Sequence, residues 1–354
     1  MPVSPLVSVL IPAHNAASWI SRTIASVTRQ SYENLEVIVV DDASTDETAA
    51  IAAHQAAADG RIVVLRNPEN LGVAAARNLG LRAARGDLVA PLDADDLWHP
   101  HKIARQLRRL GEANDRAGVV YCWSTDIDSA DAVIGRRLDL DRYEGDVYAP
   151  LVVTNFLGNS SVPLVRKEFL LAVGGWDESL RQRGGQGCED WHLYLQLAER
   201  CDFVLEPAFL VGYRQSAAAM SRDISQMRRS YRLVLEEAMR AHPELPRPVF
   251  RWSRSAFDHY TAETLQDRGF HLHGLLYLVK AALRDPTWLA RSSSRKKLRR
   301  WLRRLAAPGQ TMPKRAAIHF NEISPEPGPD IDEGRLIANR RLRLGAIRIS
   351  SMPT

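Results

Sequence analysis

The chain has 354 residues, of which 45% are hydrophobic and 25% charged, and this globular composition suits one large domain or two smaller ones. The formal net charge of +5 is concentrated in residues 291–304, which hold eight basic and no acidic residues. The three cysteines form no C-x-x-C pair, which argues against a disulfide framework or a zinc ribbon and fits a cytoplasmic protein. No apolar run reaches membrane-spanning length.

The first third of the chain alternates between strand-like and helix-like segments. Buried-strand patterns occupy residues 6–11, 35–40, 61–66, 87–92 and 118–123, and helical spacing occupies residues 18–30, 43–57, 73–84 and 99–110. Ser44 and Glu47 form a capping-box pattern, which predicts a helix that begins near Thr45. Alternation of this kind predicts an α/β fold whose largely parallel sheet has helices on both faces.

The pattern becomes less regular beyond Ser124. We expect strands at residues 160–165, 203–206 and 209–215, and helices at residues 166–173 and 189–200. Mainly helical sequence follows from 216 to 306, and proline, glycine and scattered arginines dominate 307–354. The predicted organisation is a catalytic domain over 1–215, with halves of about 1–123 and 124–215, then a helical extension over 216–306 and a poorly ordered tail over 307–354.

Three carboxylates follow the fourth predicted strand, in the stretch PLDADDLWHP: Asp93, Asp95 and Asp96. A turn with an N-cap would need only one of them. Three close carboxylates repel one another and raise one another's pKa unless a cation offsets their charge. Oxygen ligands favour Mg²⁺ or Mn²⁺, which typically bridge carboxylates to substrate phosphates. The stretch therefore predicts a metal-phosphate site.

Polar residues also follow the first two predicted strands, in PAHN (12–15) and DDASTD (41–46). Ligands of an open parallel sheet bind at the carboxyl ends of its strands. Asp42 fits either a helix cap or a contact to a base or ribose, and Arg77 fits either an exposed helix position or a phosphate contact. The chain contains neither G-x-G-x-x-G after its first strand nor a P-loop, which disfavours a dehydrogenase or a P-loop NTPase.

Several stretches together resemble a known family: VSVLIPAHN, VVDDASTDET, NLGVAAARNLGLRAARGDLVAPLDADD and GGWDESL followed by CEDWHLYLQLA. In this order and spacing they are similar to the successive motifs of the family-two glycosyltransferases, which are inverting nucleotide-sugar enzymes with the GT-A fold. The resemblance covers about residues 6–214. It implies a Rossmann-like, mixed but mainly parallel sheet flanked by helices, and leaves the helical extension outside the shared core.

The resemblance also implies roles for individual residues. Asp190 would be the general base and Glu189 beside it a further catalytic residue, although an Asp near a helix N-terminus is also stabilised by the helix dipole. Asp95 or Asp96 would bind the divalent metal. Many relatives have a metal-site histidine after the stretch GYRQS, which this chain lacks, so either Arg214 or Gln215 would replace it or the metal site would be weaker. The implied nucleotide-sugar contacts, with uracil the usual base, are Pro12, Ala13, His14, Asn15, Asp42, Arg77, Asp93, Asp95 and Arg214.

The resulting hypothesis is an inverting sugar transfer from a nucleotide donor, UDP-linked by preference, to an acceptor hydroxyl in cell-surface polysaccharide or glycolipid synthesis. A saccharide or a lipid-linked sugar would be the acceptor. Residues 291–305 combine an apolar stripe with arginines, which fits either peripheral contact with the inner face of a membrane or a helix packed on the domain. No nucleic-acid partner is expected. The alternatives are a non-catalytic nucleotide-sugar-binding or scaffold protein, and a sugar nucleotidyltransferase.

Overall fold

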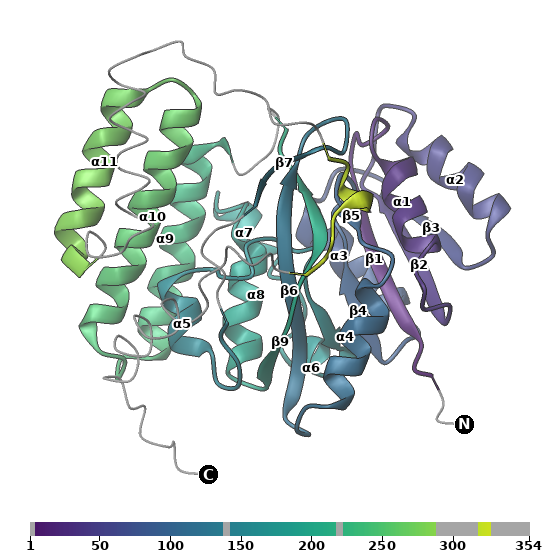
Figure 1. Ribbon diagram of the computed structural model, residues 1–354, viewed down its shortest axis with the longest axis horizontal. Coiled ribbons are helices and arrows are strands. Elements are labelled where there is room, and N and C mark those ends of the chain that lie inside the picture. Colours follow the sequence, from purple (N-terminus) through teal and green to yellow (C-terminus); the bar gives the residue numbers. More distant parts are fainter. Residues whose placement is uncertain (1–3, 137–141, 217–221, 288–317, 327–354) are drawn as a thin grey trace.

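The computed structural model describes residues 4–136, 142–216, 222–287 and 318–326 (Figure 1). Strands of these residues form one mixed sheet in the order β3-β2-β1-β4-β8-β6-β9-β5, and β7 pairs with β6 at one side. The long pairings are parallel, with seven residue pairs between β1 and β2 and nine between β6 and β9. The antiparallel pairings contain only two or three residue pairs each. The predicted mixed, mainly parallel sheet is therefore confirmed.

The first half of the sheet is built as the hydrophobic pattern predicts. Strands β1 and β2 are buried along their whole length, as expected for parallel strands that are covered on both faces. Helix α3 packs against both of them. In chain order the elements are β1 (Val7–Ala13), α1 (Ile20–Thr28), β2 (Leu35–Asp41), α2 (Thr48–Ala58), β3 (Ile62–Arg66), α3 (Val73–Ala83) and β4 (Leu88–Pro91).

The second half is less regular, because short elements and loops alternate there. Its elements are β5 (Leu97–Trp98), α4 (Lys102–Gly111), β6 (Ala117–Ile127), β7 (Val133–Arg136), α5 (Tyr148–Val153), β8 (Leu164–Arg166), α6 (Lys167–Ala172), α7 (Ser179–Gln182), α8 (Glu189–Ala198) and β9 (Asp202–Arg214). The two strands expected near the end of the domain are one continuous strand, β9, which runs parallel to β6. Strands β5 and β7 have no counterpart in the predicted pattern, because two to four residues carry too little periodicity.

The predicted capping box of α2 is wrong. The helix begins at Thr48, and the oxygens of Asp46 bond to the amide and hydroxyl of Thr48 and to the amide of Ala17. Ser44 Oγ instead accepts a hydrogen bond from the amide of Asn15, 3.0 Å away. The N-cap residue of α2 is Glu47, whose side chain makes no capping hydrogen bond, and Asp46 before it ties the loop after β1 to the start of α2.

Three helices extend the domain on one side: α9 (Ile224–Ala241), α10 (Arg247–Asp267) and α11 (His271–Arg284). Asp223 caps α9 by accepting hydrogen bonds from the amides of Ser225 and Gln226. Helix α10 contacts α5 and α11, so α11 is the outermost layer, at the left of Figure 1. Among the described residues, no helix combines the length and apolar character needed to cross a bilayer.

Within the region expected to be a poorly ordered tail, residues 318–326 pack against the sheet. Phe320 is fully buried against Ile127 and Gly212, and its amide donates to the carbonyl of Asp131. Further along, the carbonyl of Pro325 accepts from the amide of Phe209. This segment contains the short 3₁₀ helix η3 (Phe320–Glu322), and it covers strands that are far away in the sequence. The rest of 307–354 lies outside the described residues.

We expect Phe320→Ala to lower the free energy of unfolding by about 3–5 kcal/mol, because it leaves a cavity between β6 and β9. Denaturant titration would measure this loss. The matched control is Ile318→Ala, at an exposed side chain two residues away, where a change within about 0.5 kcal/mol is expected. Equal and small effects for both substitutions would show that this segment contributes no packing energy.

Candidate active site

The three aspartates of the acidic loop lie between β4 and β5, and each has a different environment. Asp93 is half-buried and pairs with Arg77. Asp96 is fully buried, and its two oxygens accept hydrogen bonds from Ser161 Oγ at 2.6 Å and from the amide of Arg214 at 2.9 Å. Asp95 is half-buried and, among the three, has no ion pair or side-chain hydrogen bond to another described residue. Its carboxylate is therefore the one left available for a ligand.

Burial and mutual repulsion weaken the ionisation of this loop. Burial, with the charge of Asp93, raises the pKa of Asp95 to about 6. Burial, together with Asp95 and Asp93, raises the pKa of Asp96 well above its usual value. A divalent cation at Asp95 would relieve this repulsion, so the donor set fits Mg²⁺ or Mn²⁺. The burial of Asp96 and the engagement of both its oxygens argue against the predicted direct metal contact for this residue. Asp96 instead holds Ser161 and β9 to the loop.

Arg77 of α3 is the main counter-charge to the acidic loop. Its guanidinium lies 2.6 Å from Asp93 and 3.3 Å from Glu189, and only 2% of its side chain is exposed. Although burial opposes ionisation, these two carboxylates raise the pKa of Arg77, which keeps it charged. Arg77 therefore joins the acidic loop to the first residue of α8. Two guanidinium nitrogens of Arg77 bind carboxylates, so they are not free to make the predicted phosphate contact.

Arg214, at the end of β9, supports the other side of the loop. It is 2% exposed and donates to the carbonyls of Asp95 and Asp128 and to the carboxylate of Asp131. Its guanidinium carbon also lies 4.4 Å from the ring centroid of Trp19, a cation–π geometry. Arg214 lies just before the position where the missing histidine was expected, and residues 217–221 after it are outside the described residues. Its position fits a structural support of the loop, and all of its donor groups have protein partners.

Asp190 lies in the first turn of α8, directly after the residue that binds Arg77. Burial and the neighbouring Glu189 raise the pKa of Asp190 to about 7, while Arg77 acts in the opposite direction. Its carboxylate accepts a hydrogen bond from the amide of Trp191 and lies 3.4 Å from the amide nitrogen of Asn155. A carboxylate with a pKa near 7 is partly deprotonated at neutral pH, and it is a stronger base than an ordinary aspartate. Asp93 also contributes to its pKa, so the two sites interact.

Glu189 is oriented by the groups around it. One of its oxygens faces Arg77, and the other accepts a hydrogen bond from the amide of Gly187 at 2.9 Å. Its side chain is nearly buried. This arrangement makes Glu189 a positioning residue for Arg77 and for the start of α8. It does not favour the catalytic role implied for the Glu189–Asp190 pair as a whole.

The predicted nucleotide-sugar contacts after β1 and β2 lie beside each other. Pro12 and Ala13 are buried in β1, whereas His14 and Asn15 are exposed in the loop that follows. His14 Nδ1 lies 2.8 Å from the carbonyl of Asp42, which joins the two strand ends.

The carboxylate of Asp42 organises a different loop. It accepts hydrogen bonds from Asn67 Nδ2 and from the amides of Leu71 and Gly72, at 2.7 to 3.0 Å. For its predicted contact, Asp42 would have to accept a hydrogen bond from a nucleotide base on the carboxylate lone pairs that these three bonds leave free. Gly72 has φ 93°, and a Cβ there would lie 2.8 Å from Arg181, so the loop requires glycine.

Asn78 is a site residue that the sequence reasoning missed. It binds both the amide and the carbonyl of Trp176, and its amide nitrogen also donates to Glu178. Gly175, with φ 77°, allows this approach, because a Cβ there would lie 2.4 Å from Asn78 Oδ1. Asn78 therefore fastens the GGWDESL turn to α3, one residue after Arg77. In the sequence, the signal for this role was the side-chain amide directly after Arg77 in the stretch NLGVAAARNLG.

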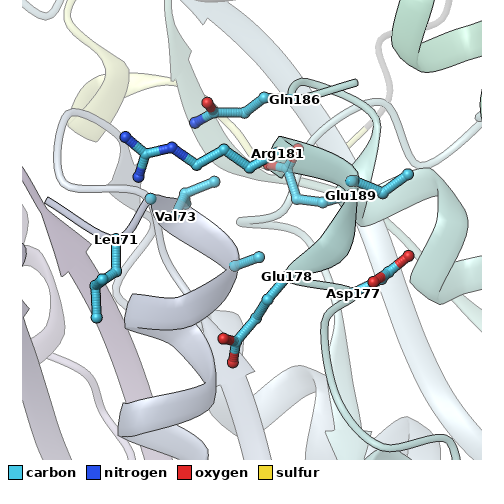
Figure 2. Close-up of a pocket in the computed structure, with 10 residues that line it drawn as sticks. Leu71, Val73, Asp177, Glu178, Arg181, Gln186 and Glu189 are labelled. Carbon is cyan, nitrogen blue, oxygen red and sulfur yellow. The ribbon is translucent and has the colours of Figure 1, made fainter. Parts of the chain in front are cut away.

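A surface pocket lies between the start of α3 and the loop that leads to α8 (Figure 2). It is small and partly open to solvent. Figure 2 shows Arg181 extending towards the loop that carries Leu71, where its guanidinium donates to the carbonyl of Asn70 at 2.8 Å. Glu189 lines the same pocket, so this hollow borders the group that pairs with Arg77.

A second group of possible metal ligands lies between α8 and α9. One atom each of Asp177, His192 and Glu237 lie within 4.8 Å of one another. Arg183 already supplies a cation there, 2.5 Å from Glu237 and 3.9 Å from Asp177. We interpret this group as an ion-pair network that fastens α9 to the domain.

Comparison with known proteins agrees with this geometry. Residues 8–157 match the family model described as glycosyl transferase family 2. This match covers less than half of the chain. It contains the acidic loop, Asp42 and Arg77, whereas Asp190 and Arg214 lie beyond it. The family-two resemblance is therefore confirmed over residues 8–157, and the assignment of individual site residues remains a prediction.

Relatives of this family share only part of their length with the chain. The putative teichuronic acid biosynthesis glycosyltransferase TuaG of Bacillus subtilis is 45% identical over 108 residues, which are 30% of this chain and 43% of that protein. An uncharacterized glycosyltransferase of Haemophilus influenzae is 41% identical over 103 residues, which are 29% of this chain and 41% of that protein. The chain thus spans less than half the length of these curated relatives.

Solved structures share the fold at low sequence identity. The mannosyltransferase PcManGT from Pyrobaculum calidifontis, in complex with GDP-Man and Mn²⁺, has a TM-score of 0.54 at 21% identity, and the match covers 87% of this chain and 82% of that one. Residues 1–349 of TarS from S. aureus, in complex with UDP-GlcNAc, have a TM-score of 0.50 at 16% identity, covering 80% and 91%. These likenesses concern the fold, which is the GT-A type.

We expect Arg77→Met to lower the free energy of unfolding by about 3–5 kcal/mol, because it leaves the Asp93 and Glu189 carboxylates without their shared cation. Thermal or denaturant unfolding would measure this. Arg232→Met is the matched control, since that arginine is 71% exposed and pairs only with an exposed Glu236 one turn away. A loss no larger than the control's, about 0.5 kcal/mol, would contradict the proposed role of Arg77.

Proposed function

We propose that the chain is a glycosyltransferase that moves a sugar from a nucleotide-diphosphate donor to an acceptor hydroxyl with inversion. The observation that carries this proposal is the Arg77 bridge, which brings the acidic loop and the start of α8 together at one edge of a GT-A sheet. A donor-phosphate site and a proton acceptor are the two groups that such a transfer needs. The family-two match supports the same chemistry.

The donor half would hold the nucleotide sugar. His14 and Asn15 are exposed beside Asp42 at the ends of β1 and β2, where the base and ribose of a nucleotide would bind. We assign the metal contact to Asp95, the carboxylate without a protein partner among the three. The divalent metal, Mg²⁺ or Mn²⁺, would neutralise charge on the leaving diphosphate. Two solved neighbours bind such donors, GDP-Man with Mn²⁺ and UDP-GlcNAc.

Asp190 would be the general base. An acceptor hydroxyl is a poor nucleophile until its proton is removed, and a carboxylate with a pKa of about 7 can remove it at neutral pH. The proton would move to a carboxylate oxygen of Asp190 as the hydroxyl attacks the anomeric carbon. Attack from the face opposite the leaving diphosphate gives inversion. Arg77, through Glu189, fixes the start of α8 and so the position of this carboxylate.

The setting belongs to the same proposal. A saccharide or lipid-linked sugar is the acceptor class, in cell-surface polysaccharide or glycolipid synthesis, and the name of the TuaG relative supports this. The free, buried cysteines Cys122, Cys188 and Cys201 fit a cytoplasmic location. We assign catalysis to residues 1–215 and treat α9 to α11 as an extension. The proposed peripheral membrane contact through 291–305 lies outside the described residues.

The alternative class is a non-catalytic nucleotide-sugar-binding or scaffold protein. The raised pKa of Asp190 favours catalysis over this alternative, because burying a carboxylate beside Glu189 destabilises the fold and serves no purpose in a scaffold. A sugar nucleotidyltransferase is disfavoured, since the loop PAHNAASW contains neither the glycines nor the lysine that such a first loop uses.

Calorimetry with UDP and GDP, each with Mn²⁺ or with chelator, tests the donor site. We expect one nucleotide to bind only with Mn²⁺, and Asp95→Asn to abolish that binding. Asp190→Asn should bind the nucleotide normally but lose about 10²–10⁴-fold in transfer or donor hydrolysis. Turnover by Asp190→Asn at the wild-type rate would exclude it as the base, and absence of all nucleotide binding would favour the scaffold alternative.

The Asp190→Asn variant needs a folding control. The raised pKa of Asp190 provides one, because it predicts how the stability of the wild type depends on pH. The folded protein retains a proton on Asp190 that the unfolded chain releases near the ordinary aspartate pKa of 3.8, so wild-type stability falls as the pH rises from there to about 7. Asp190→Asn should therefore be at least as stable as wild type at pH 8. Lower stability at pH 8 would show a capping role for the carboxylate in α8.

The pH profile of transfer gives a separate prediction. Because the base must be deprotonated, kcat/KM should rise with pH and level off above an apparent pKa near 7. Arg77 lowers that pKa, so Arg77→Lys should shift the profile to higher pH if its shorter side chain weakens the contact. Initial rates over a pH series with saturating metal would measure both profiles. A profile that is flat from pH 5 to 9 would contradict the assignment of Asp190.

A further inference from the structure

The outermost helix of the extension, α11, has an unusual apolar face. Five of the eleven large apolar side chains that the structure describes as exposed lie in or next to it: Phe270, Leu272, Leu276, Val279 and Leu283. The last four are spaced by 4, 3 and 4 residues, which places them in one stripe about 16 Å long. An exposed patch of this kind marks an interaction surface.

The stripe is not a loosely packed part of the fold. The opposite face of α11, formed by Gly274, Leu278 and Ala281, is buried against α10. Ser255 of α10 donates a hydrogen bond to the carbonyl of Ala281, and Arg284 pairs with Asp258 of α10. The helix is therefore held in place from behind, and its leucines face outward at fixed positions. Leu272 and Leu283, at its two ends, are 71% and 76% exposed.

The charged residues within α11 are all basic, whereas the exposed Asp267 precedes the helix. Helix α11 contains no acidic residue, and Lys280 is exposed beside Val279. At the N-terminal end, the Arg268 guanidinium carbon lies 5.9 Å from the ring centroid of Phe270. Beyond the C-terminal end, the sequence from 291 to 304 adds eight basic and no acidic residues. Apolar side chains flanked by cations are the chemistry that an anionic lipid surface recognises.

We propose that the outward face of α11 is a membrane-docking surface, which inserts Leu272, Leu276, Val279 and Leu283 into the interface of an anionic bilayer. A second copy of the chain is the less favoured occupant, because pairing two such faces would bring two acid-free, basic surfaces together. An anionic headgroup layer offsets the same charge. The proposal rests on the exposed side chains of α11 and on the basic sequence around it, and it does not depend on the proposed transfer reaction.

Vesicle sedimentation of the full-length chain tests this. We expect binding to vesicles of phosphatidylcholine mixed with phosphatidylglycerol, weaker binding at high salt, and little binding to phosphatidylcholine alone. Leu276→Glu should weaken the partition constant by about tenfold or more, since it removes one inserted side chain and adds a like charge to the lipid. The matched control is Leu171→Glu on α6, because Leu171 is 56% exposed and Leu276 is 61% exposed. Its partition should stay within about twofold of wild type.

Each other outcome overturns the proposal. Equal losses in the two variants would place the contact away from α11. Unchanged binding by Leu276→Glu, with full loss at high salt, would assign the contact to the basic sequence 291–304. Absence of binding to either vesicle would exclude a lipid partner. If light scattering then showed a dimer that Leu276→Glu dissociates, the face would be an interface between two copies.

Discussion

The structure depends on the neutralisation of one acidic loop by two buried guanidinium groups. Arg77 reaches the loop from α3 and Arg214 reaches it from β9, and both side chains are almost fully excluded from water. Neither cation could be buried without carboxylates, and the carboxylates could not be so close without the cations. The two arginines also come from opposite halves of the domain. The electrostatic balance of the loop therefore joins the parallel half of the sheet to the half that holds α8.

The charge balance of the site is incomplete at two positions. Asp93 and Asp96 have protein partners, whereas Asp95 has none among the described residues and Asp190 has only weak ones. Their pKa values are raised to about 6 and about 7, which is the signature of carboxylates kept in a site at a cost in stability. A ligand that brings positive charge, or a substrate that brings a proton to be removed, would relieve these two groups. The remaining carboxylates are structural supports for them.

Much of this arrangement could be predicted from the sequence, because strand ends and motif order are local properties. The strand pattern placed PAHN, DDASTD and LDADD at one edge of the sheet, and the structure has them there. The roles within each cluster were harder to predict. Whether Asp95 or Asp96 is available depends on Ser161, which is 65 residues away from Asp96 in the sequence. The hydrogen bond from Asn78 to the carbonyl of Trp176 joins residues that are 98 positions apart in the sequence.

Local rules also competed with one another. The Ser44 and Glu47 pattern is a good capping box, yet neither side chain caps α2, and Asp46 instead binds the amides of Thr48 and of Ala17 in the preceding loop. Residues 318–326 have a composition typical of a tail, and no periodicity marks Phe320 as a core residue. Its burial arises because the small Gly212 leaves room beside Ile127. Contacts between distant segments of this kind carry no local pattern.

The packing of residues 318–326 has a consequence for synthesis of the protein. The amide of Phe320 binds the carbonyl of Asp131, and the Asp131 carboxylate pairs with Arg214, which in turn holds the backbone of Asp95. A ribosome makes the acidic loop long before it makes this segment. During translation the sheet can therefore assemble while the support of the loop is still unfinished, and the site acquires its full set of contacts only after residue 326 has emerged.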